Sequence, residues 1–242
     1  MLNAEAKQLL NSIYGKEMVD AIEANKESQT NYADTDSLKQ CEEIEFAFTG
    51  RGTVVTIAER YTLFIHLLSG VKRKGLVQFI KWLKDETDFF IAPASTKYHG
   101  AEIGGLLKHS LSVYKNLLTI CQNKDIPIES IAITSLFHDV CKANFYTTST
   151  RNVKNDETGV WEKKPYYTVD EELPFGSHGG KSVYLLMAHG LELTEEEAVA
   201  INCHMGGWDY TTYHNPSGAY QKYPLAVYLH IADMLATYID KQ

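Results

Sequence analysis

Histidine and aspartate are the residues of this sequence best suited to chemistry, and one adjacent pair of them stands out. His138 and Asp139 directly follow an apolar segment, residues 131–137, that predicts a helix. Side chains at successive helix positions point about 100° apart. The pair could therefore serve two metal ions, or two sides of one ion, with the carboxylate as a bridge.

Further potential ligands flank this pair at intervals of 26 to 39 residues along the chain. In chain order the whole set reads His109, His138 with Asp139, His178, His204 and Asp233. Each interval is about long enough for a pair of helices that brings the chain back to the same place. Each ligand can therefore come from a different helix lining one cleft. Imidazole with carboxylate suits Mn, Fe, Ni, Co or Zn, and suits Ca less. We therefore expect a transition-metal centre.

The elements that must position these residues are predicted to be mostly helical. Apolar residues recur at three- and four-residue spacing in segments 58–69, 74–85, 101–122, 128–142, 180–189, 195–205 and 224–240. Thr194 with Glu197 forms a capping box, and Pro224 suits a first helical turn. Residues 146–176 break the pattern and predict an exposed β-hairpin or lid inserted between two helices. A shorter hairpin is expected over 41–57.

The ordered ligand set resembles the HD-domain superfamily of metal-dependent phosphohydrolases over residues 95–240. The resemblance rests on the order H…HD…H…H…D, on Gly104-Gly-Leu-Leu-Lys-His109 and on Ala232-Asp233 in a terminal helix. It implies an all-α HD-domain bundle with a small inserted β-hairpin and a binuclear centre of two divalent transition metals. One metal would take His109, His138, Asp139 and Asp233, and the second would take Asp139 as a bridge with His178 and His204. Two such ions make hydroxide from a bridging water and clamp the phosphoryl oxygens.

Two local stretches are similar to particular groups within this superfamily. Tyr98-His-Gly100, with the Gly-Gly-Leu-Leu-Lys-His run after it, resembles HD-type 3′–5′ exoribonucleases, although their OB-fold is not evident. His138-Asp-Val-Cys-Lys142 resembles the HDxGK run of cyclic-dinucleotide phosphodiesterases. Cys141 stands where Gly is usual, and the GYP tripeptide of that group is absent. These departures leave the metal ligands unchanged and the substrate open.

Candidate catalytic residues lie beside the expected ligands. Lys142 follows His138 by about one turn and could reach a non-bridging phosphate oxygen. His99 could hydrogen-bond the leaving oxygen or a phosphate. We therefore expect Asp139, Lys142 and His99 to act in catalysis, and Lys142 and His99 also to bind substrate.

Aromatic residues could bind a nucleobase, since every base offers a π face. Trp208, shortly after His204, is the expected substrate-binding aromatic residue, and Tyr146 or Trp161 in the lid could also stack on a base. The other histidines fit structural roles better: His66, His189 and His230 as buried, hydrogen-bonded side chains, and His214 in an exposed loop. Cys141 and Cys203 are expected to pack in the core as small apolar residues.

The first forty residues resemble a different family. Residues 7–15 and 32–37 match the KxxxNSxYG and YxDTDS motifs of family B DNA polymerases, but only sixteen residues separate them and a third carboxylate motif is missing. We therefore expect a non-catalytic remnant in which Asp34 and Asp36 are solvated loop acids. The predicted organisation is a polymerase-like remnant at 1–40, a strand and helix extension at 41–94, and the HD hydrolase domain at 95–242.

Composition limits the partners. The chain has 242 residues, 44% of them hydrophobic, and a net charge of −8. This acidity disfavours duplex nucleic acid, and no apolar run approaches the length of a membrane helix. No signal peptide is recognisable, and the four scattered cysteines indicate reduced thiols in a cytoplasmic protein. We expect a small-molecule phosphoester or nucleotide as the substrate, with the oligomeric state open.

The leading hypothesis is a phosphodiesterase acting on a nucleotide or a short oligonucleotide. A di-iron HD-type oxygenase could use the same six ligands, and O₂ uptake would indicate it. A non-catalytic nucleotide-binding module is the third hypothesis, and tight nucleotide binding without turnover in any divalent metal would indicate it.

Overall fold

The computed structural model describes residues 56–156, 158–169, 176–208 and 216–240. The polymerase-like motifs, His214 and nearly all of the hairpin expected over 41–57 lie outside these ranges. In chain order the elements are α4 (Ile57–Leu68), α5 (Leu76–Asp85), α6 (Gly105–Ile120), α7 (Ile128–Phe137), the 3-10 turn η2 (Val140–Lys142), β1 (Thr147–Lys154), β2 (Trp161–Thr168), α8 (His178–Ala188), α9 (Glu195–Cys203), the 3-10 turn η3 (Gly206–Trp208), α10 (Ser217–Lys222) and α11 (Pro224–Tyr238).

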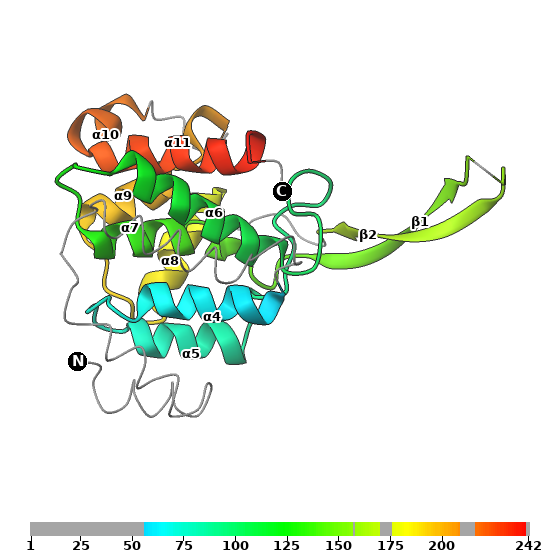
Figure 1. Ribbon diagram of the computed structural model, residues 1–242, viewed down its shortest axis with the longest axis horizontal. Helices are drawn as coiled ribbons and strands as arrows, with labels where there is room; N and C mark the ends of the chain where they lie inside the picture. Colours follow the sequence, from blue (N-terminus) through cyan, green and yellow to red (C-terminus); the bar gives the residue numbers. More distant parts are fainter. Residues whose placement is uncertain (1–55, 157, 170–175, 209–215, 241–242) are drawn as a thin grey trace.

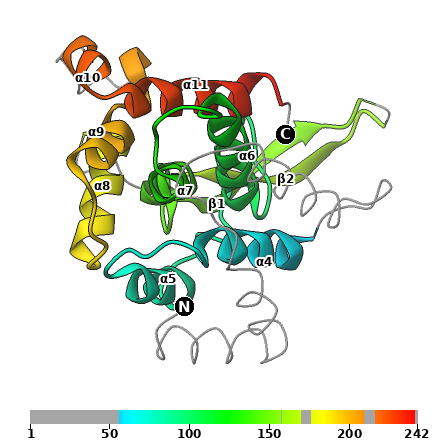
Figure 2. The same cartoon turned by 60° about the vertical axis from the view of Figure 1, so that its left-hand side comes forward.

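Helix α7 is the central helix of the bundle. Every residue from 130 to 137 is buried, as expected of a helix that is apolar on all sides. Helices α4, α6 and α9 all pack against it, and α11 packs across α6 and α9 (Figure 2). The protein is therefore a mostly α-helical bundle, as the sequence predicted.

A partly buried ion pair attaches α9 to the segment before α5. The Arg73 guanidinium contacts both carboxylate oxygens of Glu197, with Nη1–Oε2 at 2.5 Å and Nη2–Oε1 at 2.8 Å. Ser130 of α7 donates its hydroxyl to the same carboxylate at 2.7 Å. Glu197 also completes the predicted capping box with Thr194 at the start of α9. One carboxylate thus connects three parts of the bundle.

The close approach of α8 to α9 depends on a glycine. A Cβ added at Gly179 would lie 2.4 Å from the carbonyl oxygen of Ile201 and 2.5 Å from that of Asn202. Any side chain here would force the two helices apart. The glycine therefore sets the spacing between His178, at the start of α8, and His204, just after α9.

The interruption of the helical pattern is a β-hairpin, as predicted. Strands β1 and β2 pair antiparallel, in a register that runs from Thr147 opposite Thr168 to Lys154 opposite Trp161. The hairpin projects well beyond the helices (Figure 1). None of its described residues between 147 and 168 is buried.

The structure corrects one helix boundary and adds one helix. The helix expected over 128–142 ends at Phe137, and Asp139 has φ −105° and ψ 20° at the start of η2. The apolar pattern runs on because Val140 and Cys141 are also buried, although the backbone has left the α-helix. Helix α10 was not predicted, because its sequence is polar and none of its residues is buried. Within the described ranges, no helix is both long and apolar enough to cross a membrane.

Candidate metal centre

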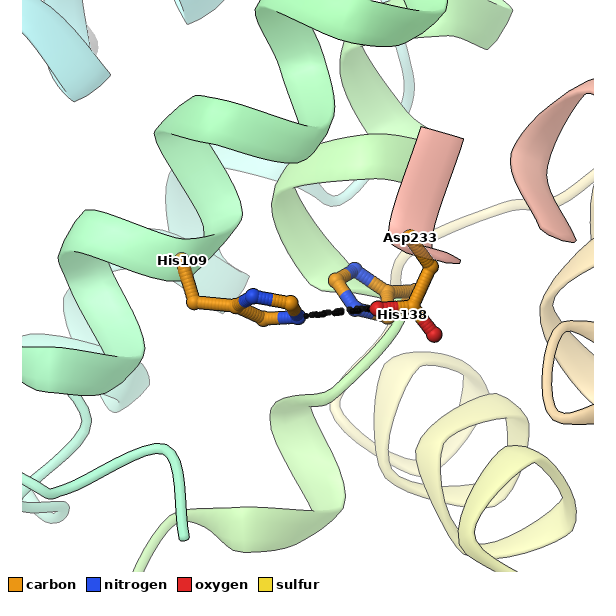
Figure 3. A group of neighbouring side chains, drawn as sticks. All are labelled: His109, His138 and Asp233. Carbon is orange, nitrogen blue, oxygen red and sulfur yellow. Dashed lines mark hydrogen bonds and ion pairs between the residues drawn. The ribbon is translucent and has the colours of Figure 1, made fainter. Parts of the chain in front are cut away.

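Three of the predicted ligands converge from three different helices or helix ends. His109 lies on α6, His138 directly follows α7, and Asp233 lies on α11 (Figure 3). Nε2 of His109 is 3.1 Å from Oδ1 of Asp233 and 3.3 Å from Nε2 of His138. Ligands bound at about 2.1 Å to one ion have donor atoms about 3 Å apart. This group has the spacing of a metal site.

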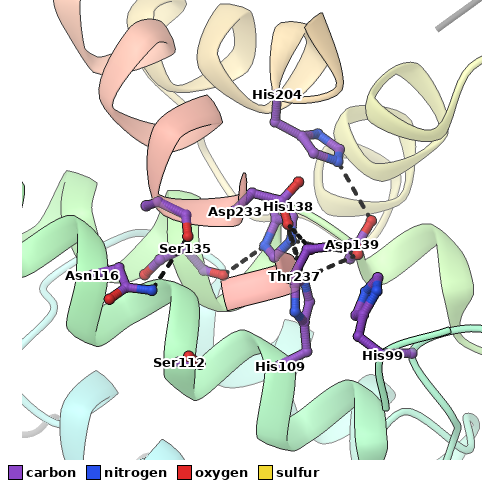
Figure 4. Close-up of polar contacts among 12 residues, drawn as sticks. His99, His109, Ser112, Asn116, Ser135, His138, Asp139, His204, Asp233 and Thr237 are labelled. Carbon is purple, nitrogen blue, oxygen red and sulfur yellow. Dashed lines mark hydrogen bonds and ion pairs between the residues drawn. The ribbon is translucent and has the colours of Figure 1, made fainter. Parts of the chain in front are cut away.

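A second group shares His138 with the first. Oδ2 of Asp139 lies 3.4 Å from Nε2 of His138, and Oδ1 lies 3.5 Å from Nε2 of His204 (Figure 4). The donor atoms of His138, Asp139 and His204 all fall within 4.8 Å of one another. The two oxygens of Asp139 thus face different partners, which is the arrangement that a bridging carboxylate requires.

The backbone orients two of these rings. Nδ1 of His138 donates to the carbonyl of Ser135 at 2.8 Å, and Nδ1 of His204 donates to that of Ile201 at 2.7 Å. Each hydrogen bond fixes the orientation of its ring, so that Nε2 is directed at the cluster. His230 in turn donates Nδ1–H to the carbonyl of His204 at 2.6 Å.

His230 makes a hydrogen bond, as expected from the sequence, but it is half-buried rather than buried, and its position beside a ligand was not foreseen. Its ring packs closely on Gly206, which has φ +57°. A Cβ at this position would lie only 2.8 Å from the imidazole, so the packing requires glycine. The hydrogen bond is made to a main-chain carbonyl, so no side-chain motif could reveal it.

The electrostatics favour deprotonated ligands. Burial raises the pKa of Asp139, but Lys142 and His138 outweigh it and hold that pKa well below its usual value. Burial raises the pKa of Asp233, but the hydrogen bond to His109 and the charges of His109, His138 and His204 outweigh it and hold that pKa low. Burial lowers the pKa of His109, which keeps its ring neutral. Metal ligands must be deprotonated, so these three side chains are in the required form at neutral pH.

His138 differs, because its pKa is raised. Burial lowers it, but Asp139 and Asp233 more than compensate. The pair of carboxylates thus favours positive charge at the position of this ring. A divalent cation would supply that charge and replace the proton.

Several buried polar atoms in the cluster have no hydrogen-bond partner. Nε2 of His204, Oδ1 of Asp139 and both ring nitrogens of His99 are among them. Leaving one such atom unsatisfied costs about 1–3 kcal/mol. A metal ion coordinated by His204 and Asp139 would satisfy two of these atoms, so the donor set fits a bound cation.

Lys142 and His99 lie where the sequence placed them, beside the ligands. Nζ of Lys142 is 2.7 Å from Oδ2 of Asp139. The ring centroids of His99 and His109 are 4.9 Å apart. Burial, together with the charges of His109 and Lys142, lowers the pKa of His99 to about 4. His99 is therefore neutral at physiological pH and can donate one hydrogen bond and accept another.

The loop that carries His99 is fixed by tight backbone contacts. Ser95 donates its hydroxyl to the carbonyl of His99 at 2.9 Å. A Cβ added at Gly105 would lie 2.0 Å from the carbonyl oxygen of Gly100, so the loop can press against the start of α6 only with glycine there. This close packing holds the His99 ring beside His109.

His178 and Trp208 are not brought into the cluster in the same way. Nδ1 of His178 lies 3.6 Å from Sγ of Cys141, and His178 belongs to neither ligand group found among the described residues. Burial raises the pKa of Cys141 to about 12, so its thiol stays protonated and packs as a core residue, as expected. Trp208 ends η3, and its side chain lies outside the described part of the chain. The roles of His178 and Trp208 therefore stay predictions.

The remaining histidines are away from the centre. His189 stacks on Trp82 with ring centroids 3.6 Å apart. His66 is half-buried on α4, and burial lowers its pKa. Both residues lie outside the ligand groups, as expected, but they are half-buried rather than buried.

An all-α bundle with a buried cluster of histidine and aspartate ligands defines a metal-binding helical protein. The model of the HD domain family matches residues 106–238, more than half of the chain. The chain therefore belongs to the HD domain family, and this membership supports a metal-dependent hydrolase. No curated protein and no solved structure matches the chain.

Proposed function

We propose that this protein is a metal-dependent phosphodiesterase acting on a nucleotide or a short oligonucleotide through a binuclear centre. The observation that supports it best is the position of Asp139. Its two carboxylate oxygens face His138 and His204 at 3.4 and 3.5 Å. A carboxylate between two ligand groups suits two adjacent ions, and paired ions suit in-line displacement at phosphorus.

In this proposal the first metal is held by His109, His138, Asp139 and Asp233. The second is held by Asp139, His204 and His178, whose ring would have to leave the thiol of Cys141. When bound, the metals supply Lewis acidity and an activated water at neutral pH. The nitrogen and oxygen donors suit Mn, Fe, Ni, Co or Zn.

The other side chains of the centre bind and orient the substrate. Lys142 is partly buried and stays charged, because burial lowers its pKa but Asp139 and Tyr146 outweigh this effect and raise it. Its ammonium group can donate to a phosphate oxygen. The neutral His99 can donate a hydrogen bond to the leaving oxygen. Trp208 is proposed to stack on a base.

The test combines metal analysis with turnover of bis(p-nitrophenyl) phosphate. The wild-type protein should bind two metals per chain and release nitrophenol in a metal-dependent reaction. His204→Ala should retain about one metal and lose turnover, whereas His189→Gln, with its ring on Trp82, should match the wild type. O₂ uptake without nitrophenol release would refute hydrolysis and indicate the oxygenase.

A further inference from the structure

The β-hairpin, which we call the arm, extends away from the helices (Figure 1). Its two strands pair only with each other among the described residues, and none of the described residues between 147 and 168 is buried. An isolated two-stranded hairpin is marginally stable in water. Core packing therefore does not explain why the arm is present, and we looked for a binding role on its surface.

The register divides the side chains of the arm between two faces. Directly opposed residues share a face. The face that we call the lysine face contains Thr148, Thr150, Asn152, Lys154, Trp161, Lys163, Pro165 and Tyr167. It carries two cations, two aromatic rings and no carboxylate. The opposite face carries Arg151, Lys164 and Glu162, with Lys164 4.0 Å from Glu162.

The groups on the lysine face are open to a ligand. Lys154 and Lys163 are exposed and make no ion pair with a described residue, whereas Arg151 on the other face lies over the ring of Tyr166. Trp161 stands opposite Lys154 and is 66% exposed. An exposed indole beside lysines that make no ion pair with a described residue suits a surface on which bases stack.

The base of the arm lies beside the metal centre. Tyr146, immediately before β1, donates its hydroxyl to the carbonyl of Ala94 at 3.0 Å, in the loop that also carries His99. Lys142, four residues earlier, contacts Asp139. A ligand lying along the arm toward its base would thus lead into the ligand cluster.

We infer that the lysine face binds single-stranded nucleic acid and directs it to the metal centre. The inference rests on the proposed function and deepens it, since it makes an oligonucleotide, rather than a mononucleotide, the substrate. Phosphates complement Lys154 and Lys163, and a base complements the ring of Trp161. The remainder of the chain is acidic, with a net charge of −8 for the whole protein, and repels a polyanion. This contrast favours binding on the arm.

The test measures binding of a fluorescein-labelled oligothymidylate of about 12 nucleotides by full-length protein in EDTA. Lys154→Gln/Lys163→Gln should weaken binding at low salt. It should also lower the salt slope of log K by about 1.4, or about 0.7 for each phosphate that a lysine no longer neutralises. Trp161→Ala should weaken binding about tenfold at an unchanged slope. Lys81→Gln/Lys84→Gln on α5 removes the same charge and should behave as wild type.

Wild-type affinity and slope in both arm variants would overturn the inference. Equal binding of polyglutamate, with no effect of Trp161→Ala, would also overturn it and indicate an acidic protein partner. Because EDTA removes metal, the result does not depend on catalysis. Arm-dependent binding by a protein that never hydrolyses bis(p-nitrophenyl) phosphate would refute the proposed function and leave only the nucleic-acid-binding site on the lysine face standing.

Discussion

Replacing Asp139 with asparagine tests the centre most directly, because the side chain keeps its size and loses its charge. Nζ of Lys142 lies 2.7 Å from Oδ2 of Asp139, and the two side chains are only 13% and 3% exposed. Removing one partner of a buried ion pair leaves the other charge uncompensated, at a cost of about 3–5 kcal/mol. For a protein of this size that lowers Tm by about 6–20 °C. We expect Asp139→Asn to show this loss in metal-free buffer.

A double-mutant cycle separates the ion pair from other effects. Asp139→Asn/Lys142→Met removes both charges and should recover much of the stability that the single change loses. Thermal unfolding by circular dichroism in EDTA measures each variant. Metal content after incubation with Mn²⁺ gives the second readout, and should fall from two ions per chain to nearly none in Asp139→Asn.

Two results would refute this reasoning. If Asp139→Asn unfolds at the wild-type temperature in EDTA, the ion pair with Lys142 does not stabilise the fold. If the variant still binds two metals per chain, Asp139 is not the bridge, and the two ligand groups must be occupied independently.

Three further predictions concern other parts of the molecule. The pKa of Glu197 is lowered, because Arg73 and other hydrogen-bond donors outweigh burial, so its stabilisation is present above the unfolded pKa of about 4.3 and is lost as pH falls through the folded pKa. Glu197→Gln should therefore be about 3 kcal/mol less stable than the wild type at pH 7. Urea unfolding should show that this difference in the free energy of unfolding narrows below about pH 4. A difference that stays constant with pH would contradict this. His230→Ala, which frees the carbonyl of His204, should weaken the second metal about tenfold, and unchanged affinity in a metal titration would exclude a positioning role. Deleting residues 1–40 should leave metal content and turnover intact, since every proposed ligand lies beyond residue 95, and loss of turnover in a folded deletion variant would show that this segment contributes.

The order of potential ligands along the chain predicted one shared site, but His178, which was predicted with the others, belongs to neither ligand group among the described residues. His109, His138, Asp139, His204 and Asp233 carry donor types that only a shared site explains, and the structure places them together. Helix positions followed from apolar spacing. The hairpin could be predicted because the helical spacing of apolar residues stops over 146–176 and turn residues appear there. Both signals are local properties of a sequence.

The end of α7 could not be predicted in the same way. Val140 and Cys141 are as apolar as the helix before them, and both are buried, so the pattern gives no sign that the backbone changes at Asp139. The hydrogen bonds from His138 and His204 to backbone carbonyls were equally hidden, since every residue offers a carbonyl. The ion pair of Arg73 with Glu197 joins residues far apart in sequence, and only the packed fold brings them together.

The ligands come from α6, from the ends of α7 and α9, and from α11, so an ion bound to them would act as a cross-link between distant parts of the chain. His109 and Asp233 are far apart in the sequence, and the cost of closing so long a loop grows only slowly with its length. Helix α11, which carries Asp233, is the last of the described helices and packs on α6 and α9. Its amide hydrogens would exchange with solvent more rapidly after chelation than those of α7 at the centre of the bundle. Loss of the ion would thus remove one of the links that hold α11 to α6 and to the end of α7.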